Sequence, residues 1–120
     1  IELINCNIQN FNIVKCNAKE INLEQNNINS FYLKSKKIRN LFLKNSQIEK
    51  LQLHTPNLEV LDVEKNPIKK FSFKNSNKLI KLMIDNNIPV YKNSPEEKLI
   101  LNFDKKPSII QDSKLSNKIF

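Results

Sequence analysis

The chain has 120 residues, enough for one domain or a short repeat array, and 39% of them are apolar, enough for a core. No apolar stretch approaches the roughly 18 residues of a membrane-spanning helix and no secretory signal is visible, so we expect no membrane association. Twenty basic residues against twelve acidic ones give a net charge of +8, typical of a protein with an acidic or nucleic-acid partner, although a composition rich in lysine, asparagine and isoleucine also produces it.

The chain contains no glycine and two cysteines. Without glycine, no glycine-rich phosphate-binding loop can form, and the left-handed positions of turns should fall to asparagine, the next most tolerant residue. Two cysteines do not make a disulfide framework, so we expect an intracellular, cytoplasmic protein.

Apolar residues recur at every tenth position through most of the chain. One column runs from Phe11 to Phe71, a second from Leu3 to Phe73, and a third from Ile8 to Ile68. One extra residue near Asn77 and Lys78 shifts the register, after which the pattern resumes. Such recurrence is the sequence signature of a repeat architecture.

Each ten-residue segment, called a ten below, contains two apolar residues separated by one residue. This pattern indicates a short strand with one face buried, followed by a polar corner. Ten residues cannot circle a filled core, so two tens should make one coil of about 20 residues, and coils should stack at roughly 4.8 Å. The predicted fold class is a mainly β repeat solenoid with parallel strands, about 4.5 coils long.

The two tens of a coil differ at the corner. The tens alternate between two sets, which we call phases. In one phase the corner position holds Cys6, Asn26, Ser46, Asn66 and Asn87. In the other phase it holds Cys16, Lys36 and Pro56. We expect the first set to form a buried ladder in which each side chain hydrogen-bonds the backbone of a neighbouring corner, because an unpaired buried backbone group costs about 1–3 kcal/mol.

Three segments resemble the leucine-rich repeat family. Leu58–Ile68 (LEVLDVEKNPI), Ile38–Ile48 (IRNLFLKNSQI) and Ala18–Ile28 (AKEINLEQNNI) are similar to its LxxLxLxxNxL segment. The resemblance implies a curved solenoid with parallel strands along the concave face. The repeats are short for that family, at 20–21 residues, and their second halves carry apolar pairs of their own, so we expect extended or strand-like convex segments. A two-faced β-solenoid is the alternative.

The repeat stops after Tyr91. Ser94–Glu97 (SPEE) has a serine cap, a proline at the first helical position and a glutamate three residues after the cap, which predicts a short capping helix that includes Leu99 and Phe103. The alternation of Leu99, Leu101 and Phe103 would instead fit a strand.

We therefore expect a leucine-rich-repeat-like solenoid over residues 1–91 and a C-terminal cap and tail over residues 92–120. Residues 108–120 are apolar enough to pack back on the solenoid or to dock on a partner. At the other end Ile1 would lie on an open strand edge, so we expect a preceding segment or a partner to cover it.

The residues suited to catalysis do not form a set. His54 is the only histidine and should point outward. Cys6 and Cys16 should be small buried residues on opposite corners, beyond the roughly 7 Å limit for a disulfide. Asp62 and Glu64 form an exposed acidic pair of a common kind. We expect no catalytic residue, cofactor, metal site or small-molecule substrate, and so not an enzyme.

The charge is distributed unevenly between the phases. The strands of the asparagine phase with their flanks sum to −1, and those of the other phase sum to +5. The candidate phosphate-contacting residues are Lys15, Lys34, Lys36, Lys37, Lys50, Lys69, Lys70 and Lys74. Exposed Tyr32 beside them could stack on a base.

Two functional hypotheses follow. In the first, the protein is a non-catalytic scaffold that binds a protein partner through an outward row made of Asn22, Phe42, Asp62 and Met83, since exposed aromatic and methionine residues are typical of interfaces. In the second, the lysine-rich convex face docks on RNA or on a ribonucleoprotein such as the ribosome, with phosphate contacts in place of base reading. Both hypotheses are true if the two faces have different partners.

Overall fold

A computed structural model describes residues 2, 11–13, 16–75, 78–85, 99–103 and 108–111, with side chains described for residues 2, 16–73 and 78–85. The ten strands among these residues are β1 (Phe11–Ile13), β2 (Glu20–Asn22), β3 (Ser30–Lys34), β4 (Asn40–Phe42), β5 (Lys50–His54), β6 (Val60–Asp62), β7 (Lys70–Asn75), β8 (Lys81–Ile84), β9 (Leu99–Phe103) and β10 (Ser108–Gln111).

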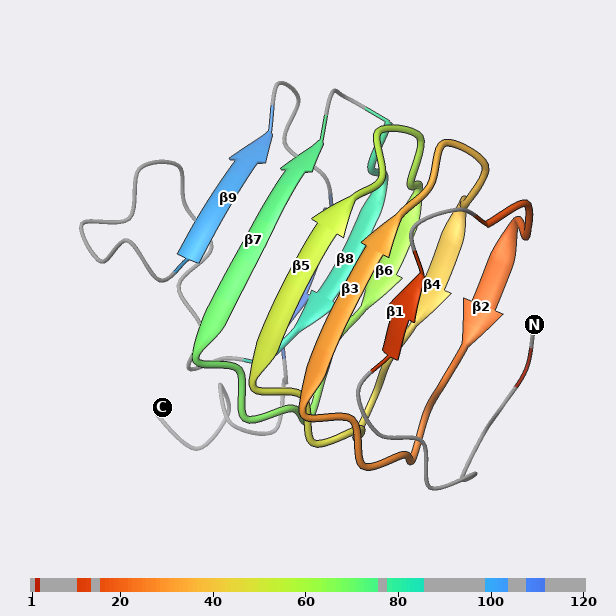
Figure 1. Ribbon diagram of the computed structural model, residues 1–120. Coiled ribbons are helices and arrows are strands. Elements are labelled where there is room, and N and C mark those ends of the chain that lie inside the picture. The colour runs from red at the N-terminus through yellow and green to blue at the C-terminus, as the bar shows by residue number, and fades with distance from the viewer. Residues whose placement is uncertain are drawn as a thin grey trace.

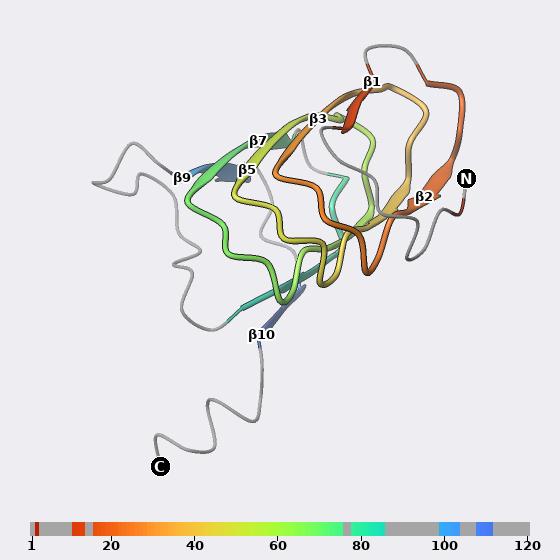
Figure 2. The same cartoon turned by 60° about the horizontal axis from the view of Figure 1, so that its bottom comes forward.

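The strands form two parallel five-stranded sheets (Figure 1). Sheet A has the order β10-β8-β6-β4-β2 and sheet B the order β1-β3-β5-β7-β9. The chain alternates between the sheets, and the strands of one sheet run opposite to those of the other (Figure 1). In Figure 2 the successive coils lie behind one another as similar loops. The prediction of a mainly β repeat solenoid with parallel strands is confirmed, with strands in both halves of each coil.

The pairing register confirms the 20-residue coil. In sheet B, Phe31 pairs with Leu51 and Leu51 with Phe71, each 20 residues on. In sheet A, Leu61 pairs with Leu82, an offset of 21 that confirms the extra residue between β7 and β8. The extra residue lies outside the strands, so the inward and outward alternation of β8 is preserved.

The core lies between the two sheets and is built from the apolar columns. On the sheet A side it contains buried aliphatic residues such as Leu41 and Leu61. On the sheet B side it contains Phe31, Phe71 and Phe73, all at most 1% exposed. Burial of one such side chain stabilises the fold by roughly 1.5–3 kcal/mol. Every coil supplies equivalent side chains, so the core is continuous along the described stack.

The predicted capping helix is wrong for Leu99–Phe103, which form strand β9. Leu99 pairs with Phe71 and Leu101 with Phe73, so the alternation of this segment continues that of β7. The physical reason is that the edge of β7 offers unpaired backbone groups along its whole length. Hydrogen bonds to that edge outweigh a helix-start signal of about 1 kcal/mol.

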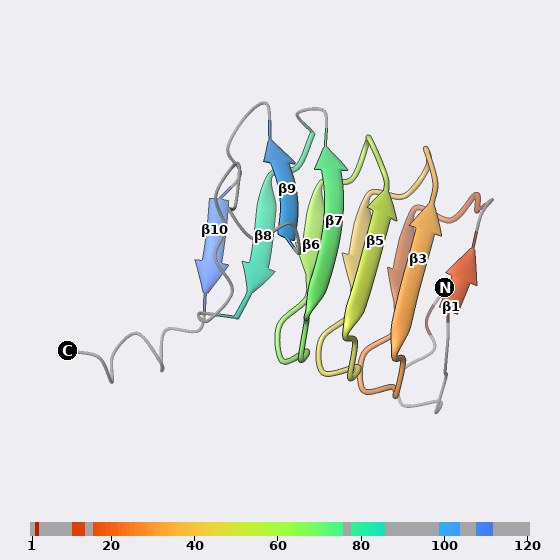
Figure 3. The same ribbon diagram turned by 60° about the vertical axis from the view of Figure 1, so that its left-hand side comes forward.

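Strand β10 confirms that this part of the C-terminal segment packs back on the solenoid. Ile109 pairs with Leu82 and Ile110 with Met83 in sheet A. Figure 3 shows β9 and β10 at the same end of the two sheets. Both strands lie within residues 92–120, so each sheet gains a strand from the segment for which the sequence predicts a cap and tail.

Left-handed backbone occurs at Gln25, Asn45, Gln47 and Lys65. The expectation that asparagine takes these positions is therefore wrong for three of the four. Three of them form one corner column, and each of these three amides donates to the next coil: Gln25 N to Lys44 O (3.1 Å), Asn45 N to Glu64 O (2.9 Å) and Lys65 N to Asp85 Oδ1 (2.8 Å). These bonds offset the roughly 1–2 kcal/mol that the left-handed region costs a residue with a Cβ.

Candidate binding surfaces

Three residues of the predicted ladder, Asn26, Ser46 and Asn66, are 5%, 0% and 5% exposed at the corner after the sheet A strands. Ser46 and Asn66 bond the backbone of the preceding coil, whereas Asn26 Nδ2 donates within its own corner, to Leu23 O at 2.9 Å. Asn66 Nδ2 donates to Leu43 O of the preceding coil at 2.8 Å, and Asn66 Oδ1 accepts from the amide of Ser46 at 2.9 Å. Ser46 Oγ in turn donates to Leu23 O at 2.6 Å. Cys6 and Asn87, also predicted in the ladder, lie outside the described residues.

The ladder fixes how far one coil can rotate or slide against the next. Asn66 bonds both within its own corner, where Nδ2 donates to Val63 O at 3.0 Å, and across to the neighbouring coil. Since the outward side chains of each sheet stand on coils held in this way, their spacing is set by the corner. The surfaces described below are therefore rigid platforms.

The opposite corner buries Ser35 and Thr55, which sequence reasoning missed because it assigned the corner to Lys36 and Pro56, one residue later. Ser35 Oγ donates to Cys16 O at 3.1 Å and accepts from the amide of Ile38 at 3.2 Å. Thr55 is 0% exposed and its hydroxyl has no hydrogen-bond partner among the described residues. The available signal was the small hydroxyl residue directly after β3 and after β5.

The register aligns the four residues of the predicted row along the outer side of sheet A. Asn22 pairs with Phe42, Phe42 with Asp62, and Asp62 with Met83. The expectation that these side chains are freely exposed is wrong. Phe42 and Met83 are half-buried and Asp62 is 7% exposed, because each side chain is flanked by neighbours on adjacent strands 4.7–4.9 Å apart.

Two further apolar residues join this face. Val60 lies two residues before Asp62 and is half-buried on the same side of β6. Ile80, just before β8, is 62% exposed and is the large apolar side chain most open to water among those described. Val60 could have been found from the period of two along β6, whereas Ile80 has the same parity as the buried Leu82, so that period does not predict its exposure. We call the outward side chains of β2, β4, β6 and β8, with Ile80, the sheet A face.

Asp62 is a carboxylate on the sheet A face with little water around it. Burial raises its pKa above the ordinary value, while the amide of Glu64, which donates to its Oδ1 at 3.0 Å, and the charge of Lys44 act in the opposite direction. Asn22 holds the equivalent position two coils earlier and accepts from the amide of Glu24 at 3.1 Å. Asp62 and Asn22 therefore make the same local turn, one with a charge and one without.

The outer side of sheet B carries the lysines. Among the predicted phosphate-contacting residues, the exposed ones are Lys34, Lys36, Lys37, Lys50, Lys69 and Lys70. Lys15 lies outside the described residues, and Lys74 is described by its backbone in β7 only. We call the outward side chains of β3, β5 and β7, with Lys36, Lys37 and Lys69, the sheet B face.

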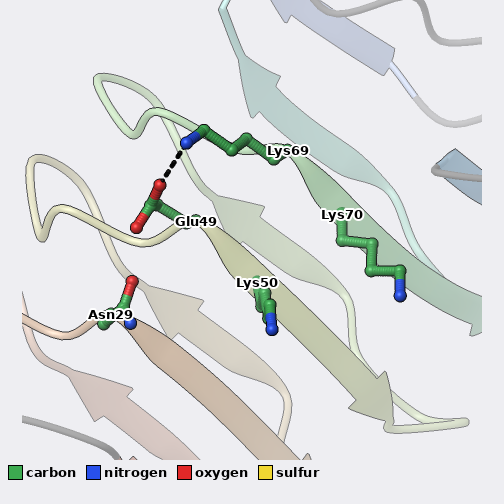
Figure 4. Close-up of a pocket in the computed structure, with 5 residues that line it drawn as sticks. All are labelled: Asn29, Glu49, Lys50, Lys69 and Lys70. Carbon is green, nitrogen blue, oxygen red and sulfur yellow. Dashed lines mark ion pairs between the residues drawn. The ribbon is translucent and has the colours of Figure 1, made fainter.

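An open hollow of about 520 Å³ lies where β5 and β7 begin, lined by Asn29, Glu49, Lys50, Lys69 and Lys70 (Figure 4). Lys69 Nζ lies 2.6 Å from Glu49 Oε1, and this hydrogen bond and charge raise the pKa of Lys69. Lys50 and Lys70 are register partners, and Figure 4 shows both side chains extended away from the Lys69–Glu49 pair. Glu49 is thus neutralised within the hollow and two lysines are left unpaired.

Tyr32 and His54 lie near the middle and the end of the sheet B face. Their ring centroids are 5.6 Å apart with a tilt of 53°, and His54 Nε2 lies 3.2 Å from Gln52 Nε2. Tyr32 is half-buried, not exposed as expected, because His54 of the next coil covers part of its ring. His54 is exposed as predicted.

The remaining candidates for chemistry lie apart from one another. Cys16 is a half-buried free cysteine packed against the core, and Cys6 is outside the described residues. Among the side chains that the structure describes, no three of the His, Cys, Asp and Glu residues come together as ligands for a metal ion. The described part of the chain also contains no helix with the length and apolar character needed to cross a membrane.

Comparisons of the chain with protein-family models, with curated proteins and with solved structures found no match. The resemblance to the leucine-rich repeat family stays a prediction made from the spacing of residues in the sequence.

Proposed function

We propose that the protein is a non-catalytic, cytoplasmic scaffold that binds a protein partner through the sheet A face. The observation that carries this proposal is the register that places Phe42, Asp62 and Met83 on three consecutive strands. Aromatic and methionine side chains are enriched in protein interfaces, and a few well-packed ones supply most of the binding free energy.

The surroundings of this row suit an interface. Arg39 and Glu59 form an ion pair of 3.2 Å beside it, with side chains 46% and 38% exposed, and can serve as the polar rim. Val60 and Ile80 enlarge the apolar area around Phe42 and Met83. The ladder holds the coils before the partner arrives, so little conformational entropy is lost on binding.

The experiment compares two aromatic positions on opposite sheets. A photo-crosslinking benzoylphenylalanine replaces Phe42 in one variant and Tyr32 in a matched control, and adducts formed in an extract of the producing cells are identified by mass spectrometry. We expect one protein to crosslink at position 42 and not at position 32. Equal adducts at both positions would contradict the proposal.

Affinity for the identified partner then tests the row itself. Phe42→Ala together with Met83→Ala should weaken binding by at least about 30-fold, the loss of roughly 2 kcal/mol that marks a hot spot. Tyr32→Ala should leave the affinity within about twofold. Since all three side chains are on outer faces, thermal unfolding should show that the variants remain folded.

The second candidate function, docking on RNA or a ribonucleoprotein, is favoured by the exposure of the six lysines on the sheet B face. The opposite sides of the solenoid can hold different partners at the same time.

A further inference from the structure

The sheet B face carries several exposed lysines and few carboxylates. Lys34, Lys36, Lys37, Lys50 and Lys70 are exposed, and within the described residues none of them lies in an ion pair with a carboxylate. The one glutamate of the hollow, Glu49, is occupied by Lys69. A group of positive charges that nearby carboxylates do not neutralise attracts a polyanion.

The lysines form two groups at opposite ends of the strands. Lys50 and Lys70 are register partners where β5 and β7 begin, so their backbones lie about 4.8 Å apart. Lys34 ends β3, where it pairs with His54, and the corner that follows carries Lys36 and Lys37. Four strand residues separate position 50 from position 54, which puts about 13 Å between the two groups.

The ring of Tyr32 lies between the two groups. Tyr32 is two residues before Lys34 on β3, and its ring contacts His54 on β5. Apart from Tyr32, the described outward side chains of these strands are polar or charged: Ser30, Lys34, Lys50, Gln52, His54, Lys70 and Ser72. The combination of flanking cations and a central ring is the arrangement by which proteins hold unpaired bases.

We propose that the sheet B face binds single-stranded RNA, with Lys50 and Lys70 contacting phosphates at one end, the group around Lys34 contacting phosphates at the other, and Tyr32 stacking on a base between them. Lysine is depleted in protein interfaces, which argues against an acidic protein as the partner. Lysine gives strong but sequence-independent contacts to phosphate, so the binding should tolerate many sequences. This inference rests on the second candidate function, which it narrows to single-stranded RNA, and it is independent of the protein-binding role proposed for the sheet A face.

The test measures binding of the full chain to a fluorescein-labelled 12-nucleotide oligouridylate by fluorescence anisotropy between 50 and 250 mM KCl. Removing two phosphate contacts with Lys50→Gln and Lys70→Gln should reduce the slope of log K against log salt by about 1.4, since each single-strand contact contributes roughly 0.7. At 0.1 M salt this corresponds to an affinity loss of about 25-fold.

The matched control removes two lysines from the sheet A side, with Lys65→Gln and Lys81→Gln. Both residues are exposed, and glutamine already occupies the left-handed corner position of Lys65 at Gln25. We expect the control to change the affinity by less than about threefold, through long-range charge alone. If it loses as much as the sheet B variant, the proposal is overturned, because net charge and not the face would then determine binding.

Two further outcomes decide the partner. Tyr32→Ala should lower the affinity roughly 5-fold or more and leave the salt slope unchanged, since stacking releases no counterions. Polyglutamate of the same charge should compete at least tenfold more weakly than the unlabelled RNA. Equal competition by polyglutamate, or absence of RNA binding at 50 mM KCl, would overturn the proposal.

Discussion

The half-coils that enter sheet A and those that enter sheet B are both built on short parallel strands and differ in several buried side chains, in their corners and in their outer faces. The sheet A half buries aliphatic residues and ends in a corner where Ser46 and Asn66 bond from coil to coil. The sheet B half buries phenylalanines and ends in a corner where Ser35 is bonded and Thr55 is not. One half therefore carries more of the coil-to-coil side-chain hydrogen bonds among the described residues, and the other carries more of the aromatic packing.

The outer faces differ as well, although packing does not require it. Acids and bases are interspersed on the sheet A side, where Arg39 pairs with Glu59, whereas exposed lysines on the sheet B face outnumber their carboxylate partners. A bias in composition would load both faces alike. The inner columns are set by the fold, and on the proposals made above the outer residues are set by what the two faces contact.

Truncating the aromatic packing should have the largest effect on stability. We expect Phe71→Ala to lower the free energy of unfolding by about 3–5 kcal/mol and Leu61→Ala, its counterpart under sheet A, by about 2–4 kcal/mol. Urea unfolding followed by circular dichroism measures both. A larger loss for Leu61→Ala would show that the contributions of the two halves to the free energy of unfolding do not follow the size of the side chains that they bury.

Removing the ladder at Asn66 should be the next largest effect. Asn66→Ala leaves Leu43 O and the amides of Ser46 and Ile48 without their side-chain partner, and we expect a loss of about 2–4 kcal/mol. Ser35→Ala at the opposite corner should lose about 1–2 kcal/mol.

Asn66→Ser is the control for the ladder, because serine already performs the same role at Ser46. It should recover at least half of the loss seen with alanine. If serine and alanine are equally destabilising, the ladder bonds do not account for the effect.

Thr55→Val should stabilise the protein by about 1 kcal/mol, since it replaces a buried hydroxyl without a described partner by a methyl group of similar size. The melting temperature is the measurement, with Thr55→Ser as the control that keeps the hydroxyl and should give no gain. A loss of stability in Thr55→Val would mean that the hydroxyl is bonded in solution.

The smallest effect concerns Asp62. Its pKa in the folded protein is raised above that of the unfolded chain, mainly by burial. Between the two pKa values the folded state binds more protons, so stability should fall as the pH rises through this window and level off above the folded pKa.

Asp62→Asn should remove that dependence and keep the hydrogen bond to the amide of Glu64, as Asn22 does with Glu24. The free energy of unfolding of the variant relative to the wild type should therefore increase from pH 3 to pH 7. A difference that stays constant with pH would contradict the raised pKa.

Much of the solenoid could be predicted because the same residue pattern recurs in successive repeats, so the sequence indicates each structural feature several times. The apolar columns, the ladder at Asn66 and the single-residue shift before β8 all follow from comparing one ten with the next. The row through Phe42 and Met83 follows for the same reason. Position within the repeat was enough to place these residues.

The features that could not be predicted depend on contacts between coils, which the residue pattern of a single repeat does not indicate. Leu99–Phe103 carry both a helix signal and a strand pattern, and the open edge of β7 decides between them. Burial of Asp62 depends on its flanking strands, and the half-buried ring of Tyr32 on the neighbouring His54. The left-handed backbone of Lys65 is supported by Asp85 of the next coil.

The constant register also determines how the solenoid grows during folding. Each new strand pairs with one 20 residues earlier, so closing each coil costs the same loop entropy wherever in the stack it happens. The last two strands close longer loops, since Leu99 joins Phe71 across 28 residues and Ile109 joins Leu82 across 27, but the extra length adds only about 0.3 kcal/mol to that cost. Folding can therefore begin at any coil and extend in both directions.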